Sequence, residues 1–310
     1  MNNQADFADE VRNSAWWSGD SRKAANGRAV DAILTKQGKM EIPDLSGVEV
    51  VQMGHVMQPV IGRLAQDKLQ IELKEADYAM THPKHDWFRS HFDFISADGK
   101  TLVEAKNYNA GTRSKFDADT NTIPLADYAQ LVHEAACHGV ERIYLAVLFG
   151  GQEFQTFEFN ITEAEKDEFI QKMAVYWGFV KANTLPEAET IEQTKLIYPV
   201  STEEQVVATQ QMEQAVAQLK AIKGQIKELE GAEEQIEVAI RNALGEKSAV
   251  VGVDGSTLVT WRSTKPSKRF ASDLFKQAMP DIYEKFVMEM PGSRRFLVKW
   301  TRLSLWFGQL

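Results

Sequence analysis

The stretch Trp87–Lys106, WFRSHFDFISADGKTLVEAK, constrains this chain more than any other, because it predicts a β-hairpin. Its first arm, 87–96, is rich in aromatic and β-branched residues, and its second arm, 101–106, alternates in character. Asp98-Gly99 stands between the arms, and Asp-Gly flanked by strands is a strong hairpin signal. If these two residues form the whole loop, Ala97 pairs with Lys100 and the register of the arms follows.

In that register each arm contributes one carboxylate to the same place, because Asp93 lies opposite Glu104. Directly opposed residues have Cβ atoms about 4.5–5.5 Å apart, and like charges there destabilise the pair. A shared divalent cation with oxygen ligands would compensate. Lys106 points to the same face as the two acids, whereas Val103 and Ala105 point to the other. An ordinary solvated charge cluster remains an alternative, and a loop of odd length would break this register.

Asp93 followed after ten residues by Glu104-Ala105-Lys106 resembles the D…(D/E)xK signature of the PD-(D/E)XK nuclease superfamily. The flanking sequence is similar to that of the lambda exonuclease and YqaJ-like phage recombination nucleases. There a helix with a Glu-Pro pair precedes the hairpin, at the place of Gln58-Pro59 here. A helix with a Tyr and a Gln follows it, at the place of Tyr128 and Gln130. The resemblance covers roughly residues 10–180.

The resemblance implies an α/β fold with a PD-(D/E)XK core, a mixed central sheet flanked by helices, followed by a C-terminal long helix and a small α+β tail. We expect a nuclease domain over 1–184, a linker over 185–205 and a helical, coiled-coil and basic region over 206–310. It also implies an exonuclease that degrades linear double-stranded DNA from 5′ to 3′ in phage-type recombination or DNA breakdown, often as a ring-shaped oligomer. Expected partners are therefore duplex DNA ends, a single-strand annealing protein and further copies of the chain.

The metal site expected from the motif holds Mg²⁺, with Mn²⁺ as a substitute, on Asp93, Glu104 and the backbone carbonyl of Ala105. The cation would polarise the scissile phosphate and lower the pKa of its bound water. Lys106 would orient the attacking water or stabilise the charge that grows on the phosphate. Gln58 replaces the Glu usual in the family and supplies only one neutral acceptor oxygen, so the number of metals stays open.

Basic side chains near the motif are candidates for holding DNA phosphates, because guanidinium binds phosphate in a bidentate fashion. Arg22 and Arg28 follow a Ser-Gly-Asp-Ser segment expected to be a turn, and the resemblance places contacts to a 5′ phosphate in this region. Arg89 precedes Asp93 by four residues on the same predicted strand face. Exposed helix-end charges are the competing interpretation for the two N-terminal arginines.

Two other functions are compatible with the same motif. A structure-specific or repair endonuclease would use the same D…ExK core, and a noncatalytic DNA-binding or assembly protein would use the same scaffold without turnover. The net charge of −9 argues against nucleic acid, since phosphate contacts need Lys and Arg. However, residues 260–310 contain ten Lys or Arg and four Asp or Glu, and a channel can be basic in an acidic protein.

The cysteine content and the distribution of apolar residues indicate the cellular environment of the protein. The single cysteine, Cys137, excludes disulfides within the chain and argues against a Cys-based zinc site. The chain has no apolar run of 18 residues and a polar start without a basic region before an apolar one. We therefore expect no membrane contact and a cytoplasmic location, that of the bacterial host if the protein is phage-encoded.

Periodicity and caps predict the other elements. Helices are expected at about 29–37, 55–69, 125–138 and 163–183, the second burying Val56, Val60, Leu64 and Leu69. A strand at 76–81 and a second hairpin of 142–149 with 153–160 complete the sheet. A helix over 206–244 has two apolar heptad rows, interrupted by Glu233, which indicate coiled-coil packing within the chain or between subunits. The apolar ending 300–310 has no assigned role.

Overall fold

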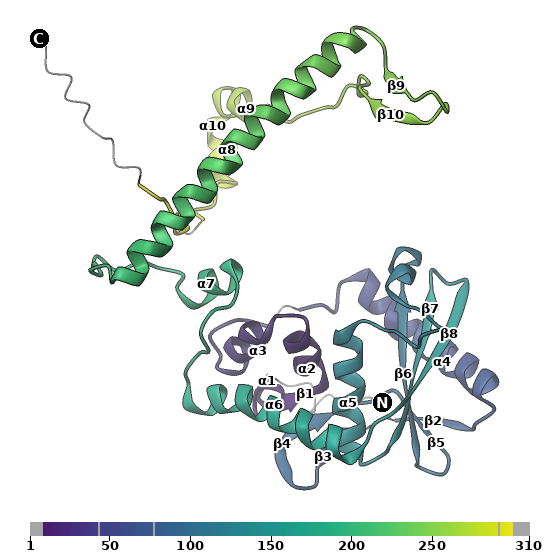
Figure 1. Ribbon diagram of the computed structural model, residues 1–310. Helices are drawn as coiled ribbons and strands as arrows, with labels where there is room; N and C mark the ends of the chain where they lie inside the picture. Colours follow the sequence, from purple (N-terminus) through teal and green to yellow (C-terminus); the bar gives the residue numbers. More distant parts are fainter. Residues whose placement is uncertain (1–8, 43, 77, 291, 300–310) are drawn as a thin grey trace, which may run out of the picture. The chain divides into compact units, whose positions relative to one another are not determined.

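The computed structural model describes residues 9–299 except 43, 77 and 291, and the chain divides into two compact units, Met1–Tyr198 and Pro199–Leu310 (Figure 1). The apolar ending 300–310 lies outside the described residues. Among the described helices, none is both long enough and apolar enough to cross a membrane.

The first unit is built on a five-stranded mixed sheet with the order β2 (Leu73–Glu75), β5 (Phe94–Ser96), β6 (Thr101–Tyr108), β7 (Arg142–Phe149) and β8 (Glu153–Asn160). β6 and β7 are parallel, and the other neighbours are antiparallel. One face packs on α4 (Glu49–Leu69) and the other on α5 (Leu125–His138) (Figure 1). The predicted class is thus confirmed: α/β, with a mixed central sheet flanked by helices and a long C-terminal helix.

Helix α4 differs from the prediction in its start and in its buried face. It begins at Glu49 and buries Ile61, Gly62 and Ala65, whereas Val56 and Val60 are exposed. The cause is a close approach to the sheet, because a Cβ atom on Gly62 would lie 2.3 Å from the ring of Phe94. The spacing of apolar residues alone predicts that the face with the larger side chains is buried. A helix this close to the sheet instead needs a small residue at the contact.

The predicted first arm of the hairpin is wrong as one continuous strand. It divides into β4 (His85–Ser90) and β5, and His91–Asp93 crosses between two sheets. β4 lies in a separate three-stranded sheet between β1 (Trp16–Trp17), which is parallel to it, and β3 (Met80–His82), which is antiparallel. The expected strand at 76–81 is therefore shorter and belongs to this second sheet.

The register of the hairpin is nevertheless the predicted one, because Phe94 pairs with Val103 and Ile95 with Leu102. The strands stop at Ser96 and Thr101, so the connection has four residues instead of two. The amide of Gly99 donates to the carbonyl of Ser96, and Gly99 takes a positive φ of 72° that suits glycine. Ala97 and Lys100 leave the ladder together, one from each strand, so the remaining facing pairs are unchanged.

The N-terminal segment is also helical where a turn was expected. Ser18–Ala25 forms α2, because Asp20 accepts a hydrogen bond from the Trp17 amide at 2.9 Å and pairs with Lys36 at 2.7 Å. Lys36 ends α3 (Ala29–Lys36), which lies where predicted. These helices, α1 (Asp9–Asn13) and α6 (Glu163–Ala182) surround a second core that contains Trp16, Ile33 and Phe88.

Two segments that were expected to be irregular contain short helices. The loop after β6 includes the 3-10 helix η2 (Ala110–Lys115). The expected linker 185–205 includes α7 (Ile191–Ile197), which packs on α3 and buries Gln193. The Gln193 side chain donates to the carbonyl of Gly27 at 3.0 Å. The first unit therefore extends to Tyr198.

The second unit contains one long helix and small accessory elements. α8 (Gln210–Leu244) is followed by the hairpin β9 (Ala249–Val251) and β10 (Thr257–Thr260), and then by α9 (Ser272–Ala278) and α10 (Pro280–Lys285) (Figure 1). Thr209 caps α8, since its hydroxyl accepts from the Met212 amide at 3.2 Å. Arg241 of α8 lies over the ring of Trp261, which joins the helix to the hairpin region.

Candidate active site

The two opposed acids and the lysine of the hairpin meet on the α5 side of the sheet. Asp93 stands directly before β5, and its Oδ2 accepts a hydrogen bond from the Ala105 amide at 2.8 Å. On β6, Lys106 Nζ donates to Glu104 Oε1 at 2.6 Å. Ala105 packs toward α4 on the opposite face. The alternation expected from the sequence thus brings Asp93, Glu104 and Lys106 together.

Helix α5 adds two buried side chains to this group. Gln130 Nε2 donates to Glu104 Oε1 at 2.6 Å and to Glu134 Oε1 at 2.8 Å. Glu134 is fully buried, and its Oε2 has no hydrogen-bond partner among the described residues. The sequence motif predicted a role for Gln130 but not for Glu134, which lies one helical turn further along the same face.

The acids of this group repel one another in a buried setting. Burial, and next the charge of Glu104, raise the pKa of Asp93 well above its ordinary value. Burial and Glu104 raise the pKa of Glu134 in the same direction. Burial alone would lower the pKa of Lys106, but Glu104 and Asp93 outweigh it and raise that pKa, so Lys106 stays a cation. One added cation near Asp93 and Glu104 would stabilise the ionised form of both.

A second charged group lies further along β6. The guanidinium of Arg22, on α2, donates from Nε to Asp127 Oδ1 at 3.0 Å and from Nη2 to the Tyr108 hydroxyl at 2.8 Å. The same hydroxyl donates to Asp127 Oδ1 at 2.7 Å. Burial, and then the charge of Asp127, raise the pKa of Tyr108 to about 12, so its hydroxyl stays neutral. Arg22 is therefore held in one orientation by two partners.

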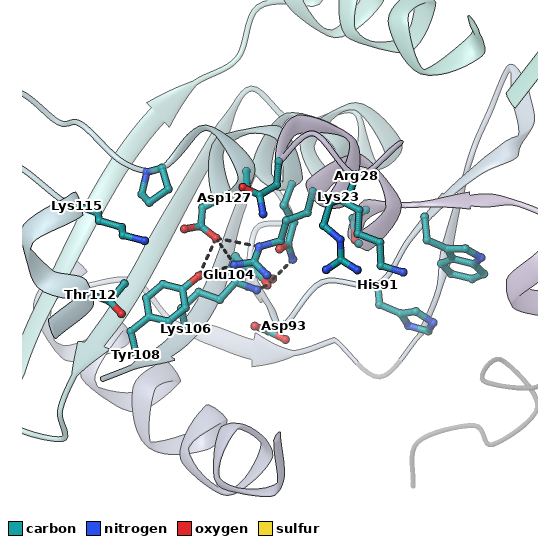
Figure 2. A pocket seen from close by; sticks show the side chains of 18 of the residues that line it. Lys23, Arg28, His91, Asp93, Glu104, Lys106, Tyr108, Thr112, Lys115 and Asp127 are labelled. Carbon is teal, nitrogen blue, oxygen red and sulfur yellow. Dashed lines mark hydrogen bonds and ion pairs between the residues drawn. The ribbon is translucent and has the colours of Figure 1, made fainter. Parts of the chain in front are cut away.

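These groups line one cavity of about 780 Å³. Figure 2 shows Lys23 and Arg28 on one side of Asp93 and Glu104, and Lys115 with Thr112 on the other. The lining contains six Lys or Arg side chains and three carboxylates: Arg12, Arg22, Lys23, Arg28, Lys106 and Lys115, with Asp93, Glu104 and Asp127. The cavity is therefore basic, although the whole chain carries a net charge of −9.

The structure brings together some of the expected supporting residues and not others. Arg22, Arg28 and Gln130 line the cavity, whereas Gln58, Arg89 and Tyr128 do not. Arg89 Nε donates to the carbonyl of Asp86 at 3.1 Å, because β4 turns away before the acids are reached. Tyr128 donates to Glu165 of α6 on another face of α5. Gln58 lies on α4, which covers the opposite face of the sheet.

The oxygen atoms available to a metal fit Mg²⁺. Within residues 9–299, with the gaps named above, no group of three or more His, Cys, Asp or Glu side chains could hold a metal ion together. Mg²⁺ does not need such a cage, since it keeps several waters and binds through one or two carboxylates and substrate phosphates. Asp93 and Glu104, with the Ala105 carbonyl beside them, offer that kind of hard oxygen site, and their mutual repulsion favours a cation there.

No protein-family model and no curated protein matches this chain. Several solved structures do match it. An alkaline exonuclease from Laribacter hongkongensis has 16% sequence identity and a TM-score of 0.46, over 56% of this chain and 91% of that one. A phage-related exonuclease from Haemophilus somnus has 11% identity and a TM-score of 0.41, over 52% and 81%. A putative exonuclease from Eubacterium rectale has 11% identity and a TM-score of 0.43, over 67% and 96%. Two of the three are named as exonucleases and the third as a putative exonuclease.

Proposed function

We propose that this chain is a Mg²⁺-dependent exonuclease that hydrolyses linear double-stranded DNA. The observation that carries the proposal is the meeting of Asp93, Glu104 and Lys106 within a cavity whose lining holds more Lys and Arg than acids. Two acids and a lysine suit hydrolysis of a phosphodiester, and the surrounding cations suit its polyanionic substrate.

The reaction adds one water to one phosphodiester: a P–O bond forms to the water oxygen, the P–O bond to the leaving group breaks, and that oxygen takes up a proton. Mg²⁺ held by Asp93, Glu104 and the Ala105 carbonyl would polarise the phosphate and lower the pKa of the attacking water. Lys106 remains protonated beside Glu104 and provides positive charge where negative charge grows on the phosphate. Gln130 fixes the orientation of Glu104 through its bond to Oε1.

The cations on the two sides of the acids would hold the backbone of the substrate. Lys23 and Arg28 come from the α2–α3 region, and Lys115 comes from η2. Arg22 is already oriented by Asp127 and Tyr108, so it loses little further freedom when it binds a phosphate. A terminal 5′ phosphate is the ligand proposed for this group, by its resemblance to the family.

The wider role rests on the same resemblance. We propose digestion from 5′ to 3′ that leaves a 3′ strand for a single-strand annealing protein, in phage-type recombination or DNA breakdown within a bacterial cytoplasm. The active form would contain more than one copy of the chain. Mn²⁺ would replace Mg²⁺, because both accept oxygen ligands.

The deciding experiment compares three duplexes: linear, nicked circular and covalently closed, each with Mg²⁺, Mn²⁺ or EDTA. An exonuclease of this kind consumes only the linear duplex and stops in EDTA. Labels placed separately at the 5′ and 3′ ends then give the polarity. Cleavage of the closed circle would instead identify an endonuclease, and binding without any cleavage would identify a noncatalytic protein.

A further inference from the structure

The proposed nuclease site makes no use of the apolar side of α8. This side carries the two heptad rows, here called the α8 seam: Met212, Leu219, Ile226, Glu233 and Ile240, with Ala215, Ile222, Leu229, Ile236 and Ala243. In the described structure the seam is open, since the exposed fraction is 51% for Ile222, 47% for Ile226, 70% for Leu229 and 62% for Ile236. Exposed apolar stripes of this length mark an interaction surface.

Charge along α8 indicates what covers the seam. Residues 220–227 include three lysines and no acid, whereas residues 228–237 include five glutamates and no base. Two copies of α8 side by side in parallel would place like blocks together, and two copies in antiparallel orientation would place opposite blocks together. The helix is therefore complementary to itself only when one copy is reversed.

The heptad rows are compatible with that orientation. In an antiparallel pair, one row of the seam faces the other row, so Ile226 meets Leu229, Leu219 meets Ile236 and Met212 meets Ala243 of the second copy. This single register uses the whole length of α8, which is about 52 Å.

The one acid in the seam disfavours the parallel arrangement. A parallel pair would oppose Glu233 to its own copy in a row that excludes water, which costs free energy. The antiparallel register places Glu233 against Ile222 instead, and it brings Lys223 of one copy beside Glu230 of the other at the flank. The parallel register offers no oppositely charged pair at the positions that flank its seam.

We propose that α8 is the dimerisation element of this protein and that it binds α8 of a second copy of the chain in antiparallel orientation. The proposal is independent of the nuclease activity, because it concerns side chains of the second unit only. The dimer therefore persists in a Glu104→Gln variant without cleavage activity.

The first test measures the mass of the full chain in solution over a range of concentrations by light scattering or sedimentation. We expect a dimer, and we expect Ile226→Asp with Leu229→Asp to raise its dissociation constant at least about a hundredfold, because four apolar side chains leave the interface. Val238→Asp is the matched control, since Val238 is 49% exposed and lies off the seam. A monomer throughout, or a dimer unaffected by the double variant, would overturn the proposal.

The second test reads the orientation by disulfide formation. Met212 and Ala243 lie about 46 Å apart within one helix, so a bond between cysteines at these positions must join two copies. Met212→Cys with Ala243→Cys should give a covalent dimer on oxidation, and neither single variant should. The native Cys137 is buried in the first unit, and the unchanged protein controls for it. Efficient cross-linking of either single variant would show a parallel pair and overturn the proposal.

The third test exchanges charge at the flank. Lys223→Glu alone and Glu230→Lys alone should each weaken the dimer on the order of tenfold, because each creates repulsion with the second copy. Lys223→Glu with Glu230→Lys together should restore it. The two positions are seven residues apart in one helix and do not meet within it. Absence of rescue in the double variant would contradict the antiparallel register.

Discussion

The two units break the usual rules of burial in opposite ways. In the first unit, Glu104 and Glu134 are buried and Asp93 is half-buried beside them, next to a core in which Leu102 and Leu145 are fully buried. In the second unit, apolar side chains such as Ile226 and Leu229 face solvent. Natural sequences depart from their own folding rules mainly where they bind something. In the first unit the repulsion between the acids favours a bound cation, and in the second unit the exposed seam favours a covering partner.

The largest expected effect tests whether the buried acids are the catalytic site. Asp93→Asn and Glu104→Gln should each lower Mg²⁺-dependent cleavage of linear duplex DNA by about a thousandfold or more, since several kcal/mol of charge stabilisation at the phosphate is lost. The measurement is the initial rate of release of labelled nucleotides. Asp98→Asn makes the same chemical change on the exposed hairpin turn and should leave the rate unchanged. Retention of full activity by both site variants would place the catalytic centre elsewhere.

The next effect contrasts close packing in the first unit with open packing in the second. Gly62→Ala should lower the free energy of unfolding by about 1–3 kcal/mol, because its Cβ meets the Phe94 ring. Gly224→Ala in α8 should raise helix stability by up to about 1 kcal/mol, because nothing lies within 4 Å and alanine favours helix. Denaturant unfolding of both variants gives the comparison. A neutral Gly62→Ala would mean that the sheet and α4 lie further apart.

A smaller effect concerns pH in the presence of EDTA. The pKa values of Asp93 and Glu134 are raised in the folded state, so the folded protein holds protons that the unfolded chain releases. The contribution of these two carboxyls to the free energy of unfolding is therefore greatest below their ordinary pKa values of about 4, and it is lost as the pH rises through the raised values. Glu134→Gln should flatten this fall, because glutamine keeps the acceptor for Gln130 and carries no charge. Thermal unfolding from pH 4 to pH 9 measures it, and an unchanged slope would contradict the burial of that charge.

The smallest effect concerns the rim of the cavity. Lys115→Ala should weaken DNA binding nearly equally for all sequences and reduce the slope of log affinity against log salt by about 1, because one phosphate contact is lost. Lys100→Ala, on the hairpin turn away from the cavity, is the matched control. Fluorescence anisotropy at several salt concentrations reports both slopes. Equal slopes for the two variants would remove Lys115 from the substrate path.

The parts of the fold that were predictable have strong local signals. The Asp98-Gly99 turn gave the register of the hairpin and so the meeting of Asp93 with Glu104. β7, β8, α5 and α6 lie where period and caps placed them, and Thr162 caps α6 by accepting from the Glu165 amide. In these segments the local preference and the tertiary fold agree.

The parts that were missed depend on contacts between distant residues. Asp20 stabilises α2 through a lysine on the next helix, and the strand from Trp87 breaks because the chain passes between two sheets. Glu134 is one of several polar side chains on α5, beside Gln130 and His133, and nothing in the local sequence distinguishes it from an exposed residue. Such features follow from the packed fold, so sequence periodicity alone does not contain them.

β6 carries a consequence for how this site can change over time. Its eight residues pair one to one with the eight residues of β7, from Thr101 with Arg142 to Tyr108 with Phe149. Glu104, Lys106 and Tyr108 are alternate members of that row, so a one-residue slip of β6 would turn all three to the opposite face together. The three side chains therefore depend on one register: an insertion in β6 before Glu104 would remove all of them from the site, and an insertion between them would separate them.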